Sequence, residues 1–309
     1  MEIWSQKSRC GVFEGRIIKA YNGFYYVRSE NKIIECKLRG RFKKDKPDIL
    51  TGDLVKISVT NENQGIIEEI LPRYSVLKRP TIANIDQVIL VCSYQQPNYS
   101  VGIFDRFLIQ ILAQELDVVL CMTKMDLYNK PEESEKPLDY YQKIGYKVHY
   151  LSLSNHRGIK DLEKELSRKT NVLAGPSGVG KSSLLQVLIP EKEFEVGEVS
   201  AKIGRGRHTT KHSELLYFKD YLIADTPGFT SLNLSNWELK KQKNFFTDFL
   251  DRSSSCKFKN TCLHDNEPGC AVKEAVEAGE IPEWRYESYQ SILNEVRENP
   301  PRNGEKKKW

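Results

Sequence analysis

Apolar and polar residues alternate at short range in the N-terminal part of the chain. Short runs rich in β-branched and aromatic residues occupy positions 11–18, 24–27, 32–36, 53–59 and 65–70. Such runs predict strands, and the Asn-Gly pair between the first two is typical of a hairpin turn. Five short strands before residue 73 predict a small barrel of the OB type. An SH3-like barrel is the alternative, because the pattern does not separate the two.

From residue 87 the pattern changes to apolar runs that alternate with helical spacing. Strands are predicted at 87–92, 118–122, 147–151 and 170–174, helices at 104–115, 139–144, 159–168 and 183–189, and a hairpin at 215–224. Alternating strands and helices predict a mostly parallel sheet. From residue 237 the chain is charged, with a helix predicted at 283–297. The tail after residue 299, rich in Pro and Lys, is expected to be disordered.

One glycine-rich stretch lies between a predicted strand and a predicted helix, and it fits G-x-x-x-x-G-K-[ST] at every fixed position. It consists of Gly175, Pro176, Ser177, Gly178, Val179, Gly180, Lys181, Ser182 and Ser183. The glycines let successive backbone N–H groups face phosphate oxygens, and the helix N-terminus favours negative charge. Lys181 can reach the β- and γ-phosphates, and the Ser182 hydroxyl can bind Mg²⁺. The stretch therefore predicts a site for ATP or GTP.

A second motif selects between the two nucleotides. Thr123-Lys124-Met125-Asp126, at the end of a predicted strand, resembles the N-K-x-D guanine motif. Asp126 can accept hydrogen bonds from the guanine ring N–H and amine, a donor pair that adenine lacks. Lys124 can lie along the base, whereas Thr123 replaces the usual Asn and has a shorter side chain. Ser152-Leu153, where GTPases carry Ser-Ala, would support the base.

A third motif, Asp225-Thr226-Pro227-Gly228, completes the set, with Asp225 expected to hold Mg²⁺ through water and the Gly228 N–H to face the γ-phosphate. The guanine motif precedes the phosphate loop, and this third motif comes last. The order is that of a circularly permuted GTPase. Permutation leaves a site intact because domain termini often lie close together.

The residues for water attack are less clearly marked. Phe229 stands where Ras-like enzymes carry a water-orienting Gln. Thr209 and Thr210 lie in the segment expected to be switch I, and Thr210 is favoured as the Mg²⁺ ligand. His208 is adjacent and can position the attacking water; a surface histidine in a basic loop is the alternative.

Three cysteines and a histidine near the C-terminus form a second candidate site: Cys256, Cys262, His264 and Cys270. Four such ligands predict a closed structural Zn²⁺ site and leave no open position for catalysis. The segment is polar and too short to bury a core, so the metal is expected to supply its folding energy. Free surface thiols are the alternative.

The distribution of charge along the chain indicates a class of binding partner. The net charge is +5, and basic residues concentrate at 37–46, 202–211 and 302–308. On a phosphate-handling protein, such segments suit a large polyanion such as RNA. The chain carries no secretory signal and no apolar run approaching the ~18 residues of a membrane helix. We therefore expect a cytoplasmic protein without a membrane partner.

The barrel, the three nucleotide motifs, the segment 204–210 and the Cys-Cys-His-Cys cluster occur in the order of the RsgA (YjeQ/YloQ) family, which the chain resembles over residues 10–295. Departures from the family pattern are Thr123 for Asn, Leu153 for Ala and Lys211 where many members have Thr. The resemblance implies an OB barrel, a permuted G domain and a helical zinc domain. It implies a monomeric GTPase that is stimulated by the small ribosomal subunit and acts late in its maturation.

On this reading the domains are an RNA-binding barrel at 1–73, a circularly permuted GTPase domain at 74–236 and a helical zinc domain with a basic tail at 237–309. The barrel and zinc domain would bind rRNA, and the GTPase domain would couple GTP or GDP to release. One alternative is an RNA-binding assembly factor that uses GTP as a switch with negligible turnover. Another is an ATP-dependent enzyme, against which Asp126 argues.

Overall fold

The structure, a computed structural model, describes residues 12–21, 23–40, 48–61, 63–78, 80–130, 135–190, 213–229 and 243–299, with the backbone alone at 225–229. The chain forms two compact units. The first comprises Met1–Gln87, Leu166–Leu173 and Ile189–Phe229, and the second Val88–Glu165, Ala174–Leu188 and Thr230–Trp309.

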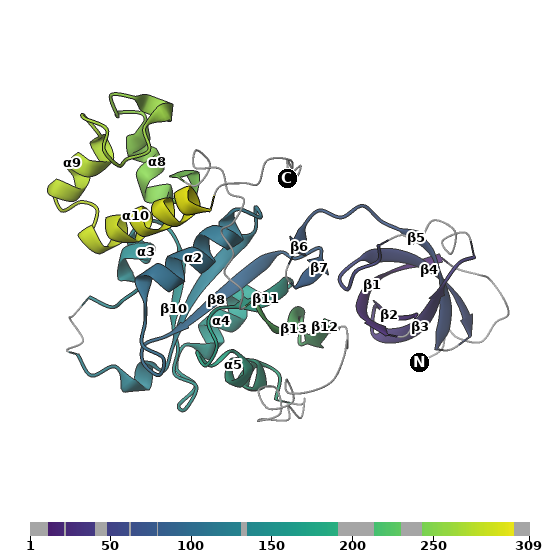
Figure 1. Cartoon of the computed structure of the whole chain (residues 1–309). Helices are drawn as coiled ribbons and strands as arrows, with labels where there is room; N and C mark the ends of the chain where they lie inside the picture. The colour runs from purple at the N-terminus through teal and green to yellow at the C-terminus, as the bar shows by residue number, and fades with distance from the viewer. Residues whose placement is uncertain are drawn as a thin grey trace. The chain divides into compact units, whose positions relative to one another are not determined.

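The first unit contains a closed five-stranded barrel (Figure 1). Its strands are β1 (Val12–Tyr21), β2 (Phe24–Ser29), β3 (Lys32–Leu38), β4 (Leu54–Asn61) and β5 (Gln64–Ile70). They pair in the order β1-β2-β3-β5-β4 and back to β1, with β3 and β5 parallel and the other pairs antiparallel. The inward apolar side chains, Ile17, Val27, Ile34, Cys36, Val55, Ile57 and Ile67, form its core. The predicted OB-type barrel is confirmed.

The segment that follows the barrel carries a short hairpin, β6 (Val76–Lys78) with β7 (Thr81–Ala83). Gly52 approaches this hairpin so closely that a Cβ there would lie 2.0 Å from the Ala83 carbonyl oxygen. Gly52 also has φ +96°, a conformation that glycine adopts without strain. The Asn84 side-chain amide donates to the Gly52 carbonyl at 3.0 Å. The connection between β3 and β4 is therefore packed directly on the hairpin.

The remaining strands of the first unit are β11 (Thr170–Ala174), β13 (Tyr221–Phe229) and β12 (Glu214–Phe218), neighbours in that order. β12 and β13 form the predicted antiparallel hairpin. β13 is longer than expected, because it continues through the Asp225-Thr226-Pro227-Gly228 motif. Asp225 lies opposite Glu214 in the pairing register.

In the second unit, strands β10 (Lys147–Tyr150), β9 (Asp117–Thr123) and β8 (Gln87–Ser93) are neighbours in that order. Every residue of β8 is buried, as expected for a strand covered on both faces. The connecting helices are α2 (Val101–Leu112), α3 (Asp139–Lys143), α4 (Ile159–Leu166) and α5 (Lys181–Leu188). On α2, Phe104, Phe107, Leu108 and Ile111 follow helical spacing and are buried, which fixes its inward face.

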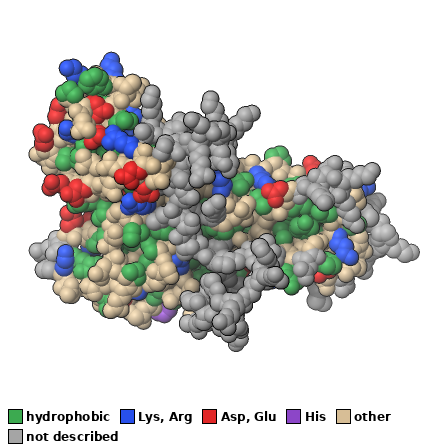
Figure 2. Space-filling view, viewed as in Figure 1, with side chains coloured by type: hydrophobic (Ala, Val, Ile, Leu, Met, Phe, Trp, Pro, Cys, Tyr) green, Lys and Arg blue, Asp and Glu red, His purple; other side chains and the backbone are tan. Residues whose placement is uncertain are grey.

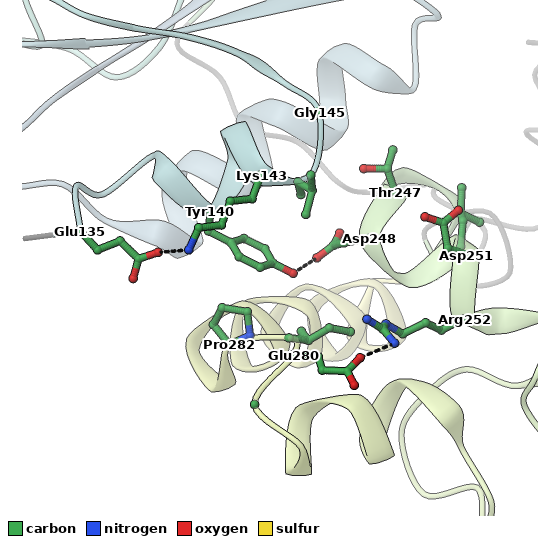
Figure 3. A pocket seen from close by; sticks show the side chains of 14 residues that line it. Glu135, Tyr140, Lys143, Gly145, Thr247, Asp248, Asp251, Arg252, Glu280 and Pro282 are labelled. Atoms are coloured by element: carbon green, nitrogen blue, oxygen red, sulfur yellow. Dashed lines mark hydrogen bonds and ion pairs between the residues drawn. The ribbon is translucent and has the colours of Figure 1, made fainter.

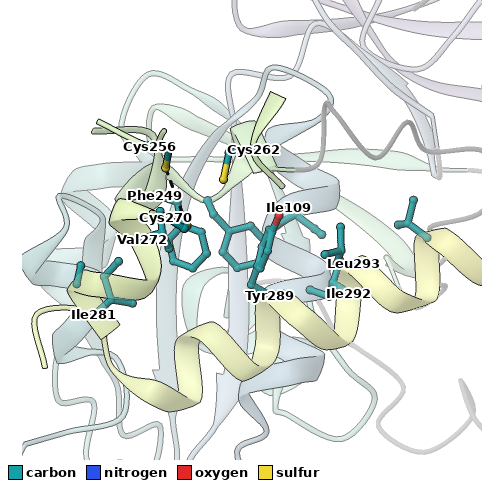
Figure 4. Packing of buried hydrophobic residues seen from close by; sticks show 13 residues of the cluster. Ile109, Phe249, Cys256, Cys262, Cys270, Val272, Ile281, Tyr289, Ile292 and Leu293 are labelled. Atoms are coloured by element: carbon teal, nitrogen blue, oxygen red, sulfur yellow. Dashed lines mark hydrogen bonds between the residues drawn. The ribbon is translucent and has the colours of Figure 1, made fainter. Parts of the chain in front are cut away.

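The C-terminal part of this unit is helical, with α8 (Thr247–Ser253), α9 (Ala271–Glu277), α10 (Glu283–Glu298) and the single turns η2 (Lys243–Phe245) and η3 (Lys259–Thr261). The predicted helix at 283–297 is confirmed. Phe246, Phe249, Tyr289 and Ile292 pack around the cysteines, together with Ile109 of α2 (Figure 4). The cysteine segment, residues 256–270, contributes its three cysteines to this core, and the flanking segments together with Ile109 of α2 supply the other apolar side chains.

Candidate functional site: a nucleotide pocket and a metal cluster

The phosphate loop runs from the end of β11 into α5, which begins at Lys181. Gly175 has φ +134°, and a Cβ there would lie 2.0 Å from the Val91 carbonyl oxygen of β8. No other residue fits that position, because both the backbone angle and the space exclude a side chain. Gly178 and Gly180 also have positive φ, at +80° and +96°. The sequence motif therefore folds into the tight turn that phosphate binding requires.

Lys181 folds back over this loop. Its Nζ atom donates hydrogen bonds to the carbonyl oxygens of Gly175 at 2.7 Å and Pro176 at 2.6 Å. Burial lowers the pKa of Lys181 to about 8. Because a buried ammonium favours a nearby anion, the pKa shift and the position of Lys181 are both suited to phosphate binding.

Asp126 lies just after β9, in the single turn η1 (Met125–Leu127). The Ser152 hydroxyl donates to Asp126 Oδ1 at 2.9 Å, and Ser152 itself is buried. This bond orients the exposed carboxylate. The sequence predicted that Ser152 and Leu153 would support the base. The structure adds a contact between Ser152 and the Asp126 carboxylate, which the sequence did not predict.

Thr123 of the guanine motif contacts the phosphate loop. Its buried hydroxyl lies 2.6 Å from the Val179 carbonyl oxygen of the phosphate loop and 3.1 Å from the Cys92 carbonyl oxygen of β8. A hydroxyl has one proton to donate, and the shorter distance points to Val179. Thr123 therefore connects the guanine motif to the phosphate loop.

Lys124 makes a second hydrogen-bonded connection between the guanine motif and the phosphate loop. It has φ +58°, and its Nζ atom donates to the carbonyl oxygens of Gly178, at 3.2 Å, and Gln96. Gln96 was not among the predicted residues. Its position after a fully buried strand, in a Gln-Gln-Pro-Asn turn, is the only sequence signal that marks it. The segment also reaches the phosphate loop, since a Cβ at Gly178 would lie 3.5 Å from Pro97.

The other predicted nucleotide residues are placed only in part. Pro176, Ser177, Ser182 and Ser183 lie in the phosphate loop and the first turn of α5, with Ser182 and Ser183 exposed. A Cβ at Gly180 would lie 3.8 Å from Leu153. Asp225 and Gly228 lie on β13, where the structure describes the backbone alone. His208, Thr209 and Thr210 lie outside the described residues.

The predicted metal ligands come together in one cluster. One ligand atom from each of Cys256, Cys262, His264 and Cys270 lies within 4.8 Å of all the others, and all four residues are buried. His264 Nδ1 lies 3.6 Å from the Cys256 sulfur and 3.4 Å from the Cys270 sulfur, and the two sulfurs are 4.0 Å apart. A tetrahedral zinc with ordinary bond lengths separates its ligand atoms by about 3.5–3.8 Å. The cluster therefore fits a closed zinc site.

The surroundings of His264 also suit a metal ligand. Its Nε2 atom lies 3.1 Å from the Ser253 hydroxyl, which donates its own proton to the Phe249 carbonyl oxygen at 2.8 Å. Ser253 must then accept from Nε2–H, which leaves the Nδ1 lone pair facing the sulfurs. Burial, followed by the charge of Lys243, lowers the pKa of His264 to about 4 and keeps the ring neutral. These residues would hold one structural Zn²⁺.

The C-terminal helices are joined to α2 by a buried ion cluster. Arg285 of α10 is fully buried and binds Asp248 of α8 through two bonds, at 2.9 and 3.0 Å. It also binds Asp105 of α2 at 2.5 Å, and the Tyr141 hydroxyl donates to the same Asp105 oxygen at 2.6 Å. No sequence motif marked Arg285 or its partners.

A cavity of about 940 Å³ adjoins this cluster, between the segment before and after α3, the helix α8 and the α9–α10 connection (Figure 3). Its charged side chains largely pair with one another. Lys143 binds Glu135 at 2.9 Å, and Arg252 binds Glu280 at 2.7 Å. None of the predicted nucleotide or metal residues lines it.

Comparison with known proteins decides the family. The family model for the RsgA GTPase matches residues 70–235, and the model for the RsgA N-terminal domain matches residues 14–67. The chain belongs to the RsgA family. It is accordingly a GTPase, an enzyme that hydrolyses GTP, and its motif order is the circular permutation expected from the sequence.

Curated relatives carry the name small ribosomal subunit biogenesis GTPase RsgA. The Bacillus pumilus protein is 44% identical over 296 residues, covering 94% of this chain and 99% of the relative, and the Carboxydothermus hydrogenoformans protein is 46% identical over 285 residues, covering 92% and 97%. Among solved structures, YloQ, described as a circularly permuted GTPase, is 39% identical with a TM-score of 0.78, covering 94% of this chain and 97% of YloQ. YjeQ from Thermotoga maritima is 35% identical with a TM-score of 0.77, covering 93% and 99%.

Proposed function

We propose that this GTPase acts in late maturation of the small ribosomal subunit, binds its rRNA and uses GTP hydrolysis to control release. One observation carries the nucleotide part: the guanine motif and the phosphate loop are hydrogen-bonded to each other through Thr123 and Lys124. The relatives' name supports the ribosomal part. Among the described residues, no helix is long and apolar enough to cross a membrane.

The proposed roles follow from side-chain chemistry. Asp126 accepts hydrogen bonds from guanine, and Lys181 with the loop N–H groups binds the phosphates. Ser182, Thr210 and Asp225 would hold Mg²⁺, which neutralises charge on the phosphate oxygens. His208 positions the attacking water, and the domains are those delimited at residues 73 and 236. A structural Zn²⁺ at the cysteine cluster maintains the C-terminal region.

The decisive experiment measures phosphate release from GTP with purified small subunits, with large subunits and with neither. Small subunits should stimulate the rate by about 10²-fold, since ordering the site and orienting water yield factors of that size. His208→Ala should keep GDP binding and subunit binding and lose most of the stimulated rate. A rate that is equally fast with and without small subunits would refute control by the subunit.

A further inference from the structure

The loop between the first two cysteines of the metal cluster presents an aromatic ring between two lysines. We name residues 257–261 the zinc-ligand loop. Phe258 is 44% exposed, and Lys257 and Lys259 on either side of it are exposed as well. Within the described ranges, neither lysine has an ion pair. A single exposed phenyl ring is unremarkable on a protein surface, so the surroundings must show whether this one is positioned.

The backbone holds the loop in one shape. The ammonium group of buried Lys243 donates hydrogen bonds to the carbonyl oxygens of Asn260 at 2.6 Å and Cys262 at 3.0 Å. The Phe258 carbonyl accepts from the Thr261 backbone N–H at 3.0 Å and from the Thr261 hydroxyl at 2.8 Å. The backbone of the loop is therefore fixed by hydrogen bonds between its two metal ligands, and this backbone places Phe258 at the surface.

Helices α9 and α10, by contrast, carry a net negative charge that disfavours phosphate. Helices α9 and α10 with their connection, residues 271–298, carry seven glutamates against Lys273, Arg285 and Arg297, a net charge of 3 − 7 = −4. Figure 2 shows Asp and Glu side chains gathered along these helices, with Lys and Arg side chains at the end of the region where the connection between α8 and α9 lies. Among the described residues of this region, the zinc-ligand loop therefore offers an RNA backbone a more favourable approach than the surface of α9 and α10.

We propose that the zinc-ligand loop binds a single-stranded RNA segment, with Phe258 stacked on an unpaired base and Lys257 and Lys259 on the flanking phosphates. An exposed phenyl ring beside unpaired cations suits an unstacked base, since every base offers a π-face and a phosphate on each side. Paired RNA keeps its bases stacked and gives Phe258 no partner. This inference rests on the proposed function and names the RNA class and the residues that meet it.

The test uses the full-length, zinc-loaded protein with a fluorescent single-stranded RNA ten nucleotides long and with purified small subunits. Phe258→Ala should weaken binding to the RNA and to the subunits about tenfold or more, which is the usual effect of losing one stacked base. Phe258→Trp should retain binding to both, because tryptophan also stacks on a base. Leu250→Ala is the matched control, because Leu250 of α8 is 40% exposed and apolar in the same region. Substitution of both lysines by Gln should reduce the salt-dependence slope by about 1.4, from about 0.7 for each phosphate contact.

Zinc content and GDP affinity should be unchanged in every variant. A loss of RNA binding then results from the changed surface and not from misfolding. A photoreactive phenylalanine analogue at position 258 should crosslink to rRNA on the subunit. Crosslinking to a ribosomal protein instead, or unchanged RNA binding by Phe258→Ala, would overturn the inference. The proposed function would survive either result, because stimulation of GTP hydrolysis at saturating subunit concentration tests it separately.

Discussion

Replacement of Arg285 by Met should detach the C-terminal helices from α2 at a large cost. Met preserves much of the volume but leaves the carboxylates of Asp105 and Asp248 buried without a cation, with side-chain exposures of 0% and 3%. Breaking a buried ion pair by removing one partner costs about 3–5 kcal/mol. The hydroxyl groups of Tyr140 and Tyr141 would still donate to the two carboxylates, but neither neutralises a charge.

The assay is hydrogen exchange of the backbone amides in α8 and α10. A cost of about 3–5 kcal/mol raises the population of the locally opened state by about 10² to more than 10³-fold, and exchange should accelerate by that factor. GDP binding should persist, because the charged partners of Arg285, Asp105 and Asp248, include none of the nucleotide residues that the structure describes.

The chain supplies a matched control one residue along α2. Arg106 binds Glu295 of α10 at 2.8 Å, with side-chain exposures of 22% and 35%. Such solvated pairs contribute about 0–1 kcal/mol, so Arg106→Met should accelerate exchange by no more than about fivefold. Adding Asp105→Asn to Arg285→Met should recover part of the loss, since one buried charge is removed. Equal effects of the two single Arg replacements would refute the reasoning from burial.

Three further outcomes follow from the sites. Thr123→Val should weaken GDP binding about tenfold and GMP binding far less, because the lost bond positions the loop for the β-phosphate, and Thr123→Ser should restore both. GDP affinity should be constant below the Lys181 pKa of about 8 and fall as pH rises above it. The nucleotide favours the charged form of Lys181, so above this pH binding takes up a proton. Lys181→Arg should remove the pH dependence when GDP affinity is titrated over a pH series. Elemental analysis should find one Zn²⁺ per chain, lost in Cys262→Ser with GDP binding intact.

The parts of the site that the sequence predicted are those whose residues are contiguous. The phosphate loop is nine consecutive residues whose glycines dictate the turn, and the metal ligands lie within fifteen residues of one another. The barrel strands are likewise predicted from the local alternation of apolar and polar residues, because successive side chains of a strand point to opposite faces of the sheet. These features were predicted correctly because local sequence determines them.

What the sequence did not reveal depends on partners far along the chain. Arg285 and Asp105 are 180 residues apart, and no period or motif connects them. The contact of the Thr123 hydroxyl with the Val179 carbonyl, 56 residues away, was likewise not predicted from the motif. The hydrogen bond from Lys124 to the Gln96 carbonyl oxygen was not predicted, for the same reason. Such contacts follow from tertiary packing alone.

The C-terminal region consequently has two separable sources of stability. The metal cluster holds the segment from Cys256 to Cys270, whereas α8 and α10 are also held by Arg285 and by packing around Ile109 of α2. Loss of metal should therefore loosen the zinc-ligand loop and leave α10 in place, and loss of Arg285 should release the helices while the four ligands stay together. If Phe258 acts from that loop, metal loss must reduce RNA binding even in a protein whose helices remain folded.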